Sequence, residues 1–248
     1  MSKKRAALVL GASGSVGQAL VKVLAQSGWF DPIVTLVRKP VPDSAAATSQ
    51  AGRSLREVIV SPMEAGNLER ATREAAAALP DDVVGFSVLG VGAGTSRLTL
   101  EEHRAVDVVL NGAFARGLKA SGKVKHLAFM SAAGANPSAS TTGSGAAGGA
   151  RYNRVKGEAE EAVRQSGPEV VSVLRPAMII GSQHTPWLLE KTLPLFSFIT
   201  PGRYKSIRAE QIAQAMAVLG KEPPQASQVY HYPEMVALIE GALSSSRG

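Results

Sequence analysis

The sequence predicts an α/β fold: a doubly wound, Rossmann-type parallel sheet with helices on both faces. Three observations predict it. Short β-branched or Leu-rich runs alternate with stretches of helical period, these runs are almost uninterruptedly apolar, and a glycine motif directly follows the first of them. With 248 residues, 45% of them hydrophobic, the chain can bury a substantial core, so we expect a single domain over residues 1–248 and exclude a disordered chain.

Each strand is predicted from a short apolar run that ends at a glycine, proline or charged boundary. The six runs are Ala6–Leu10, Ile33–Val37, Glu57–Val60, Val83–Leu89, Val124–Met130 and Val170–Leu174. Their continuous apolar character is typical of parallel strands that are covered on both faces.

Helices are predicted where apolar residues recur every three or four positions, as they do from Val16 to Leu24. The predicted helices between strands are Ser15–Gln26, Asn67–Leu79, Leu100–Ala120 and Tyr152–Gln165. After Pro176 the pattern loosens, and we expect residues 176–248 to form small elements that cap the carboxyl edge of the sheet on the substrate side. These elements are helices near Trp187–Leu195, Arg208–Leu219 and up to Leu243, with a short strand at Gln228–Tyr232.

Composition excludes several functional classes. The chain has no cysteine, so disulfides, a thiolate nucleophile, iron–sulfur clusters and cysteine-ligated zinc are excluded, and its four dispersed histidines predict no metal site. No apolar run approaches the roughly 20 residues that span a bilayer, so we expect a soluble, cytoplasmic protein without a membrane partner. The net charge of +7 favours an anionic partner, but the basic clusters lack interleaved aromatic residues, so we expect no specific nucleic acid.

The segment Gly11-Ala12-Ser13-Gly14-Ser15-Val16-Gly17 lies between the first strand and the first helix. Dinucleotide-binding loops occupy this position, where glycines permit a tight turn and close approach to a pyrophosphate at the helix N-terminus. The sequence therefore predicts cofactor contacts from Gly11, Ser13, Gly14, Ser15, Val16 and Gly17. The alternative is a tight strand–helix turn that binds nothing.

The second strand ends in Arg38 and Lys39, where NAD-binding proteins commonly place an acidic residue. A guanidinium can hold the 2′-phosphate of NADP(H) through charge-assisted hydrogen bonds. We therefore predict NADP(H) as the cofactor, with solvated surface charge as the alternative for both residues.

Tyr152 and Lys156 are four residues apart in a predicted helix, so their side chains share one face. A nearby ammonium lowers the pKa of a phenol and so brings it closer to the range in which it exchanges protons. The alternative is an exposed tyrosine with an unrelated lysine.

Taken in order, five features resemble the short-chain dehydrogenase/reductase superfamily. They are Gly11-x-x-Gly14-x-x-Gly17, Leu89-Gly90-Val91-Gly92, Ser131, Tyr152-x-x-x-Lys156 and Arg175-Pro176. The resemblance covers about residues 5–220 and is strongest to the extended or atypical branch. Within that branch, Val83–Gly90 and Val155-Lys156-Gly157-Glu158 are similar to the Tat-interacting-protein-like oxidoreductases.

The resemblance implies that Tyr152 is the general acid/base and that Lys156 holds the nicotinamide ribose. It gives Ser131 the role of a substrate-polarising hydroxyl, although the family commonly places that hydroxyl one or two positions later, where this chain has alanines; the alternative is a serine that caps backbone groups. It also implies cofactor contacts from Leu89, Gly90, Pro176, Met178 and Ile179. Asp107 falls near the family's structural asparagine, and we expect a solvated carboxylate or a helix contact there.

The uncharged segment Gly134–Ala150 is rich in Gly, Ala and Ser, and we expect a mobile loop that serves as a spacer or as a flap over the substrate. The function predicted from these observations is an NADP-dependent oxidoreductase acting on a small carbonyl or alcohol, as a monomer or homodimer. The alternative is an NADPH-binding regulatory or redox-sensing protein that acts through a protein partner.

Overall fold

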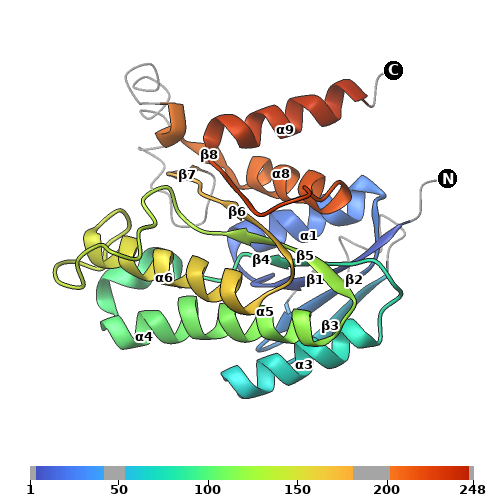
Figure 1. The fold of residues 1–248 in the computed structure, drawn as a ribbon, viewed down its shortest axis with the longest axis horizontal. Coiled ribbons are helices and arrows are strands. Elements are labelled where there is room, and N and C mark those ends of the chain that lie inside the picture. The colour runs from blue at the N-terminus through green and yellow to red at the C-terminus, as the bar shows by residue number, and fades with distance from the viewer. Residues whose placement is uncertain (1–3, 42–53, 181–201, 246–248) are drawn as a thin grey trace.

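A seven-stranded, wholly parallel sheet forms the centre of the protein (Figure 1). The computed structural model describes residues 4–41, 54–180 and 202–245. The strand order is β3-β2-β1-β4-β5-β6-β9, which confirms the predicted doubly wound fold. The strands are β1 (Arg5–Leu10), β2 (Phe30–Val37), β3 (Leu55–Ile59), β4 (Val83–Ser87), β5 (Val124–Met130), β6 (Val170–Leu174) and β9 (Gln228–Tyr230).

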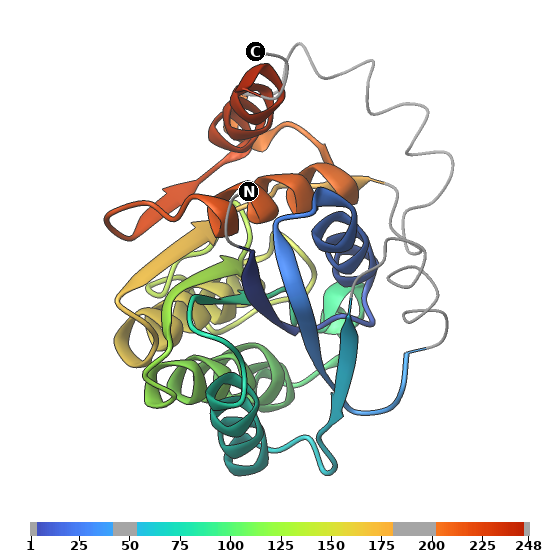
Figure 2. The ribbon, with the colours of Figure 1, turned by 90° about the vertical axis from the view of Figure 1, so that its right-hand side faces the viewer.

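Helices cover both faces of this sheet (Figures 1 and 2). On one face lie α1 (Ser15–Ser27) and α8 (Ala209–Lys221), with α9 (Tyr232–Ser245) packed outside α8. On the other face lie α3 (Ala65–Ala77), α5 (Asn111–Ala120) and α6 (Ala150–Ser166). The short α4 (Leu100–Arg104) comes before α5 in the chain. None of the helices in the described part of the chain combines the length and apolar character needed to cross a bilayer.

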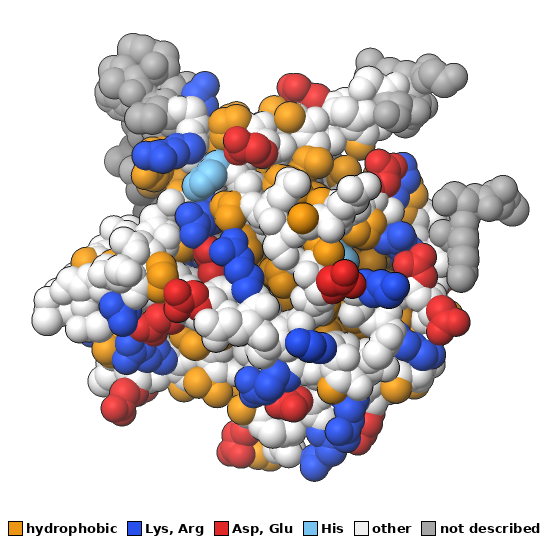
Figure 3. Space-filling view, in the orientation of Figure 1, with side chains coloured by type: hydrophobic (Ala, Val, Ile, Leu, Met, Phe, Trp, Pro, Cys, Tyr) orange, Lys and Arg blue, Asp and Glu red, His pale blue; other side chains and the backbone are white. Residues whose placement is uncertain are grey.

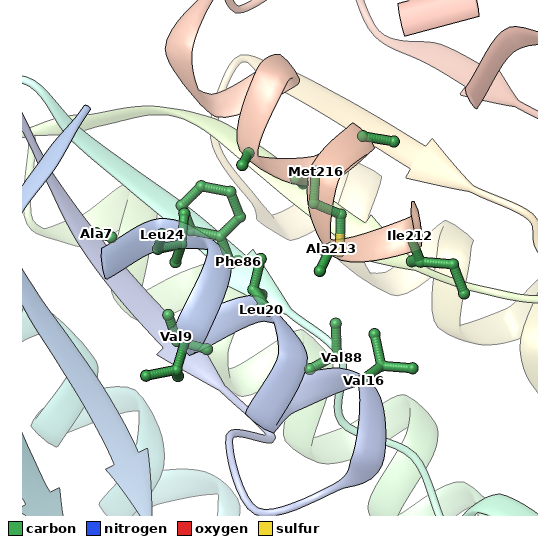
Figure 4. Packing of buried hydrophobic residues seen from close by; sticks show 14 of the residues in the cluster. Ala7, Val9, Val16, Leu20, Leu24, Phe86, Val88, Ile212, Ala213 and Met216 are labelled. Carbon is green, nitrogen blue, oxygen red and sulfur yellow. The ribbon is translucent and has the colours of Figure 1, made fainter. Parts of the chain in front are cut away.

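Two apolar layers hold these helices to the sheet. In the first layer, Leu20 and Leu24 of α1 and Met216 of α8 pack around Phe86 of β4, and all four side chains are fully buried (Figure 4). The second layer joins the opposite face of the sheet to α3, α5 and α6. Because strands with apolar residues on both faces need both layers, the sequence pattern and the three-layer architecture have the same cause.

The helix predicted at Leu100–Ala120 contains an irregularity. Between α4 and α5 the backbone forms a π-helical turn over Ala105–Leu110. Such a turn shifts the phase of the side chains that follow it. Asp107, which lies within the turn, is buried with 1% exposure.

The elements after Pro176 differ in part from the predicted cap. Strand β9 extends the main sheet, and α8 covers a sheet face because its apolar stripe, which includes Ile212 and Met216, packs against α1. Strands β7 (Ile179–Ile180) and β8 (Ile207–Arg208) form a separate small sheet. The predicted helix near Trp187–Leu195 lies outside the described residues.

On the face shown in Figure 3, basic and acidic side chains are interspersed.

Candidate active site

The strand order changes direction between β1 and β4, so the topological switch point of the sheet lies at the carboxyl ends of these two strands. The glycine loop follows β1, and Leu89-Gly90 follows β4. Gly11 has φ +90°, and a Cβ there would lie 2.6 Å from the backbone nitrogen of Leu89. The two segments therefore touch, and only glycine fits at residue 11.

The N-terminus of α1 is open for an anion. Gly14 is its N-cap residue, with extended backbone and no side-chain capping bond, and the first turn contains no acidic residue. The Gly14 N–H closes the turn on the Gly11 carbonyl at 3.2 Å, and Ser13 is exposed beside it. Unpaired N–H groups and the helix dipole at such an end suit a pyrophosphate, so the loop residues present fit a dinucleotide cofactor.

Arg38 and Lys39 follow the carboxyl end of β2, next to β1 in the sheet, and both are exposed. Within the described residues, neither side chain forms a hydrogen bond or ion pair. Their charges are therefore available for a ligand that lies along this edge.

Tyr152 and Lys156 lie on one face of α6, where the ammonium nitrogen of Lys156 is 5.6 Å from the centre of the Tyr152 ring. Lys156 is buried with 6% exposure, whereas Tyr152 is partly exposed. A Cβ at Gly90 would lie 3.0 Å from the Lys156 nitrogen. The pair is therefore placed against the segment that follows β4, at the topological switch point.

A buried carboxylate and a histidine complete this cluster. Oδ2 of Asp107 lies 2.5 Å from the Lys156 nitrogen and 3.4 Å from Nε2 of His103. The His103 ring lies 5.8 Å from the Tyr152 ring, between centres, and is 1% exposed. Of the two expectations for Asp107, the structure therefore supports a helix contact. The sequence carried a signal for this, because His103 and Asp107 have the same spacing of four as Tyr152 and Lys156.

Ser131 directly follows β5, and its side chain takes part in a buried polar network. Its hydroxyl donates to Oε1 of Glu160 at 2.6 Å, and Arg175 donates to both oxygens of Glu160 at 2.8 and 2.7 Å. Ser131 is 4% exposed and Glu160 3%. A serine hydroxyl has one proton, so polarising a substrate carbonyl from Ser131 would require the bond to Glu160 to break.

The turn after β6 contains Pro176, Met178 and Ile179. The Pro176 carbonyl accepts the N–H of Ala133, and the Met178 carbonyl accepts the N–H of Ile207, both at 2.9 Å. The Met178 side chain is 44% exposed. Backbone bonds thus fix this turn between the end of β5 and β8, at the same edge of the sheet.

Comparison with known proteins decides the family. A family model described as NAD(P)H-binding matches residues 11–223. Protein FMP52, mitochondrial, from Eremothecium gossypii is 30% identical over 183 residues, which are 72% of this chain and 68% of the relative. The chain belongs to the short-chain dehydrogenase/reductase superfamily.

Two solved structures show the same fold at low identity. A short-chain dehydrogenase/reductase from Serratia marcescens aligns with a TM-score of 0.65 and 18% identity, over 93% of this chain and 98% of that one. MoeE5 in complex with UDP-glucuronic acid and NAD aligns with a TM-score of 0.62 and 18% identity, over 96% and 82%. The protein thus has the fold of an oxidoreductase of this superfamily and an NAD(P)H-binding domain, as the resemblance of its motifs predicted.

The segment Gly134–Ala150, which precedes α6, is bonded to the first turns of that helix. Arg154 donates to the carbonyl of Ala139, within this segment, at 3.2 Å. Arg151 donates to the carbonyl of Leu98, which joins α6 to the residues before α4, at 2.9 Å. The Asn136 N–H bonds the Asn153 carbonyl at 2.9 Å. The residues that bond this segment, Asn153 and Arg154, lie just outside Gly134–Ala150, and the mobility expected from its composition stays a prediction.

Proposed function

We propose that this protein is an NADP(H)-dependent oxidoreductase that transfers a hydride between the nicotinamide and a small carbonyl or alcohol substrate. The observation that carries the proposal is the partly exposed Tyr152 beside the buried ammonium of Lys156, at the sheet edge that also carries the glycine loop. A protein that only binds the nucleotide needs the lysine for the ribose, but it has no evident need of the tyrosine proton.

The bound cofactor supplies or accepts the hydride, and the side chains manage the proton. In the direction of reduction, the Tyr152 hydroxyl would give its proton to the substrate oxygen, which becomes the alcohol oxygen, and Tyr152 would be left as a phenolate. In oxidation, the phenolate takes the proton back. The positive charge of Lys156 would stabilise the phenolate, which favours proton donation in reduction and keeps the base form available for oxidation.

The remaining cofactor contacts are proposed from position. Ser13, Ser15, Val16 and Gly17 lie at the open N-terminus of α1, where they can meet the pyrophosphate. Leu89 and Gly90 would contact the ribose, and the turn at Pro176, Met178 and Ile179 would hold the carboxamide. Arg38 and Lys39 would bind the 2′-phosphate, which favours NADP(H) over NAD(H).

Calorimetric titration with NADPH and NADH tests the cofactor. We expect NADPH to bind more tightly, and Arg38→Ala to weaken NADPH by about tenfold with a much smaller effect on NADH, since a bond to a charged group contributes about 1.5–3 kcal/mol. The matched control is Lys125→Ala, which removes an exposed cation at the start of β5, on the opposite edge of the sheet. An equal loss for both cofactors in Arg38→Ala contradicts the assignment.

Tyr152→Phe tests the chemistry. The ring and its packing on His103 remain, so NADPH affinity should persist while turnover in a carbonyl-reduction screen falls by at least a hundredfold, in line with loss of a general acid. Retained turnover would falsify the role given to Tyr152.

One observation favours a second candidate, an NADPH-binding regulatory protein. The Ser131 proton is donated to Glu160, and Ala132 and Ala133 follow it, so the site offers no second hydroxyl there for a substrate. A chain that binds NADPH but reduces no carbonyl, and that binds a protein partner only when NADPH is present, would support this candidate over the enzyme. The cytoplasmic location and the monomeric or homodimeric state stay predictions; the name of the Eremothecium gossypii relative places that protein in mitochondria.

A further inference from the structure

The carboxylate of Asp107 connects three parts of the site. Oδ1 accepts the N–H of Val91 at 3.0 Å, in the segment after β4. Oδ2 faces Lys156 of α6 at 2.5 Å and His103 of α4 at 3.4 Å. With 1% exposure, Asp107 makes these contacts away from solvent.

On the basis of the oxidoreductase function proposed above, we propose that Asp107 is a positioning residue that holds the charged amine of Lys156 in place beside Tyr152. The acid/base unit then consists of Asp107, Lys156 and Tyr152, with only Tyr152 exchanging a proton with the substrate. Asp107 touches neither reacting group and acts through Lys156.

The physical reason lies in the burial of Lys156. Burial disfavours an ammonium and lowers its pKa, but the Asp107 carboxylate, with smaller contributions from Tyr152 and Glu160, outweighs that cost and raises the pKa of Lys156 above its ordinary value. Burial likewise disfavours the charged form of Asp107, yet Lys156 and His103 together lower its pKa to about 2. Both groups are therefore charged at neutral pH, as an ion pair.

The other charged groups near this amine cannot replace Asp107. Glu160 lies one turn further along α6, but its carboxylate is occupied by Ser131 and by two bonds from Arg175. The segment after β4 approaches through Gly90 and contributes backbone only. Among the described residues, Asp107 is therefore the carboxylate in direct contact with Lys156.

His103 supports Asp107 from behind. Its Nε2 faces the same carboxylate oxygen, and its ring packs near that of Tyr152. Because His103 is 1% exposed, it gives no direct route for protons to solvent. Its place in the cluster is to limit the positions that Asp107 and Tyr152 can take.

The decisive variant is Asp107→Asn, which keeps the size of the side chain and removes its charge. Without the carboxylate, burial should lower the pKa of Lys156. The amine then loses its proton at a lower pH than in the parent, so the alkaline limb of the turnover profile should move to lower pH by more than about one pH unit, and activity should recover as the pH falls. NADPH affinity below that limb should stay within about threefold of the parent, since the glycine loop is untouched.

A matched control removes another carboxylate bridge between α6 and the helical stretch from α4 to α5, in which Asp107 lies. Glu158 on α6 bonds Arg104 on α4 at 2.7 Å and does not touch Lys156. Glu158→Gln should leave the pH profile in place. A merely structural role for Asp107 predicts lower turnover at every pH with no shift of the profile, and that result would overturn the proposal.

NMR of the lysine side-chain amines tests the same inference without turnover. Lys156→Met identifies the resonance, which should titrate above free lysine in the parent and at a lower pH in Asp107→Asn than in the parent. If Asp107→Asn does not fold, the parent still decides, because a Lys156 pKa at or below that of free lysine overturns the proposal. If the parent reduces no carbonyl, the proposed function fails, but this titration still shows whether Asp107 holds the amine.

Discussion

Removing the Ser131 hydroxyl distinguishes a structural role from a catalytic one. Ser131→Ala deletes a 2.6 Å bond to a buried carboxylate, and bonds to charged groups contribute about 1.5–3 kcal/mol. Glu160 keeps both bonds from Arg175, so it is not left without partners. The loss should therefore fall near the lower end, about 1.5 kcal/mol of unfolding free energy, or about 3–6 °C in Tm for a chain of this size.

The assay is urea unfolding followed by circular dichroism, together with turnover of any carbonyl substrate found in the screen. We expect the stability loss above and a fall in turnover of less than about tenfold, because the Ser131 proton points to Glu160 and not to the substrate. Ser172→Ala is the matched control: this buried serine of β6 bonds Nε2 of His126 at 2.9 Å, a pairing of neutral groups worth about 1 kcal/mol. Unchanged stability with turnover reduced a hundredfold would refute the reasoning and restore Ser131 as the carbonyl-polarising donor.

Two further changes test the packing and the pH dependence. Gly11→Ala should lower the unfolding free energy by more than about 1 kcal/mol and weaken NADPH binding, because a Cβ there meets Leu89 and φ is +90°. The control Gly66→Ala in α3 meets nothing within 4 Å and should be neutral or slightly stabilising. Urea unfolding and calorimetry compare the two variants, and equal effects would contradict the steric argument. Burial, with the charge of Arg5, lowers the pKa of His126 from 6.5 to about 4, so the unfolded chain binds a proton below pH 6.5 that the folded protein excludes. The unfolding free energy should be independent of this histidine above pH 6.5 and fall by about 3 kcal/mol as the pH drops to 4. His126→Gln should flatten this pH dependence of the urea midpoint, and an unchanged slope would contradict the role given to His126.

The fold was predictable because its main requirement is local and repeated. A central parallel strand is buried on both faces, so runs such as Ala6–Leu10 and Val124–Met130 show an apolar character that does not depend on their neighbours. The edge strand β3 is only partly buried, and its run Glu57–Val60 begins with a charged residue. The glycine loop was predictable for a similar reason, since its position between a strand and a helix can be read within a few residues. The π-helical turn at Ala105–Leu110 left no such mark, because its apolar residues suit an α-helix equally well.

The partners of the candidate site could not be predicted in the same way, because they come from elements far apart in the sequence. Ser131 was expected at the end of β5 and lies there, but its hydroxyl is directed by Glu160 on α6, which in turn is held by Arg175 after β6. In the sequence, Asp107 stands between two valines, and its spacing of four from His103 is the local signal of a contact. In the fold this carboxylate is buried, and a buried carboxylate requires a cation beside it. The contact with Asp107 therefore indicates that Lys156 carries a positive charge. The Tyr152–Lys156 pair could be found from its spacing, but what fixes the charge of the lysine depends on a contact that only the fold creates.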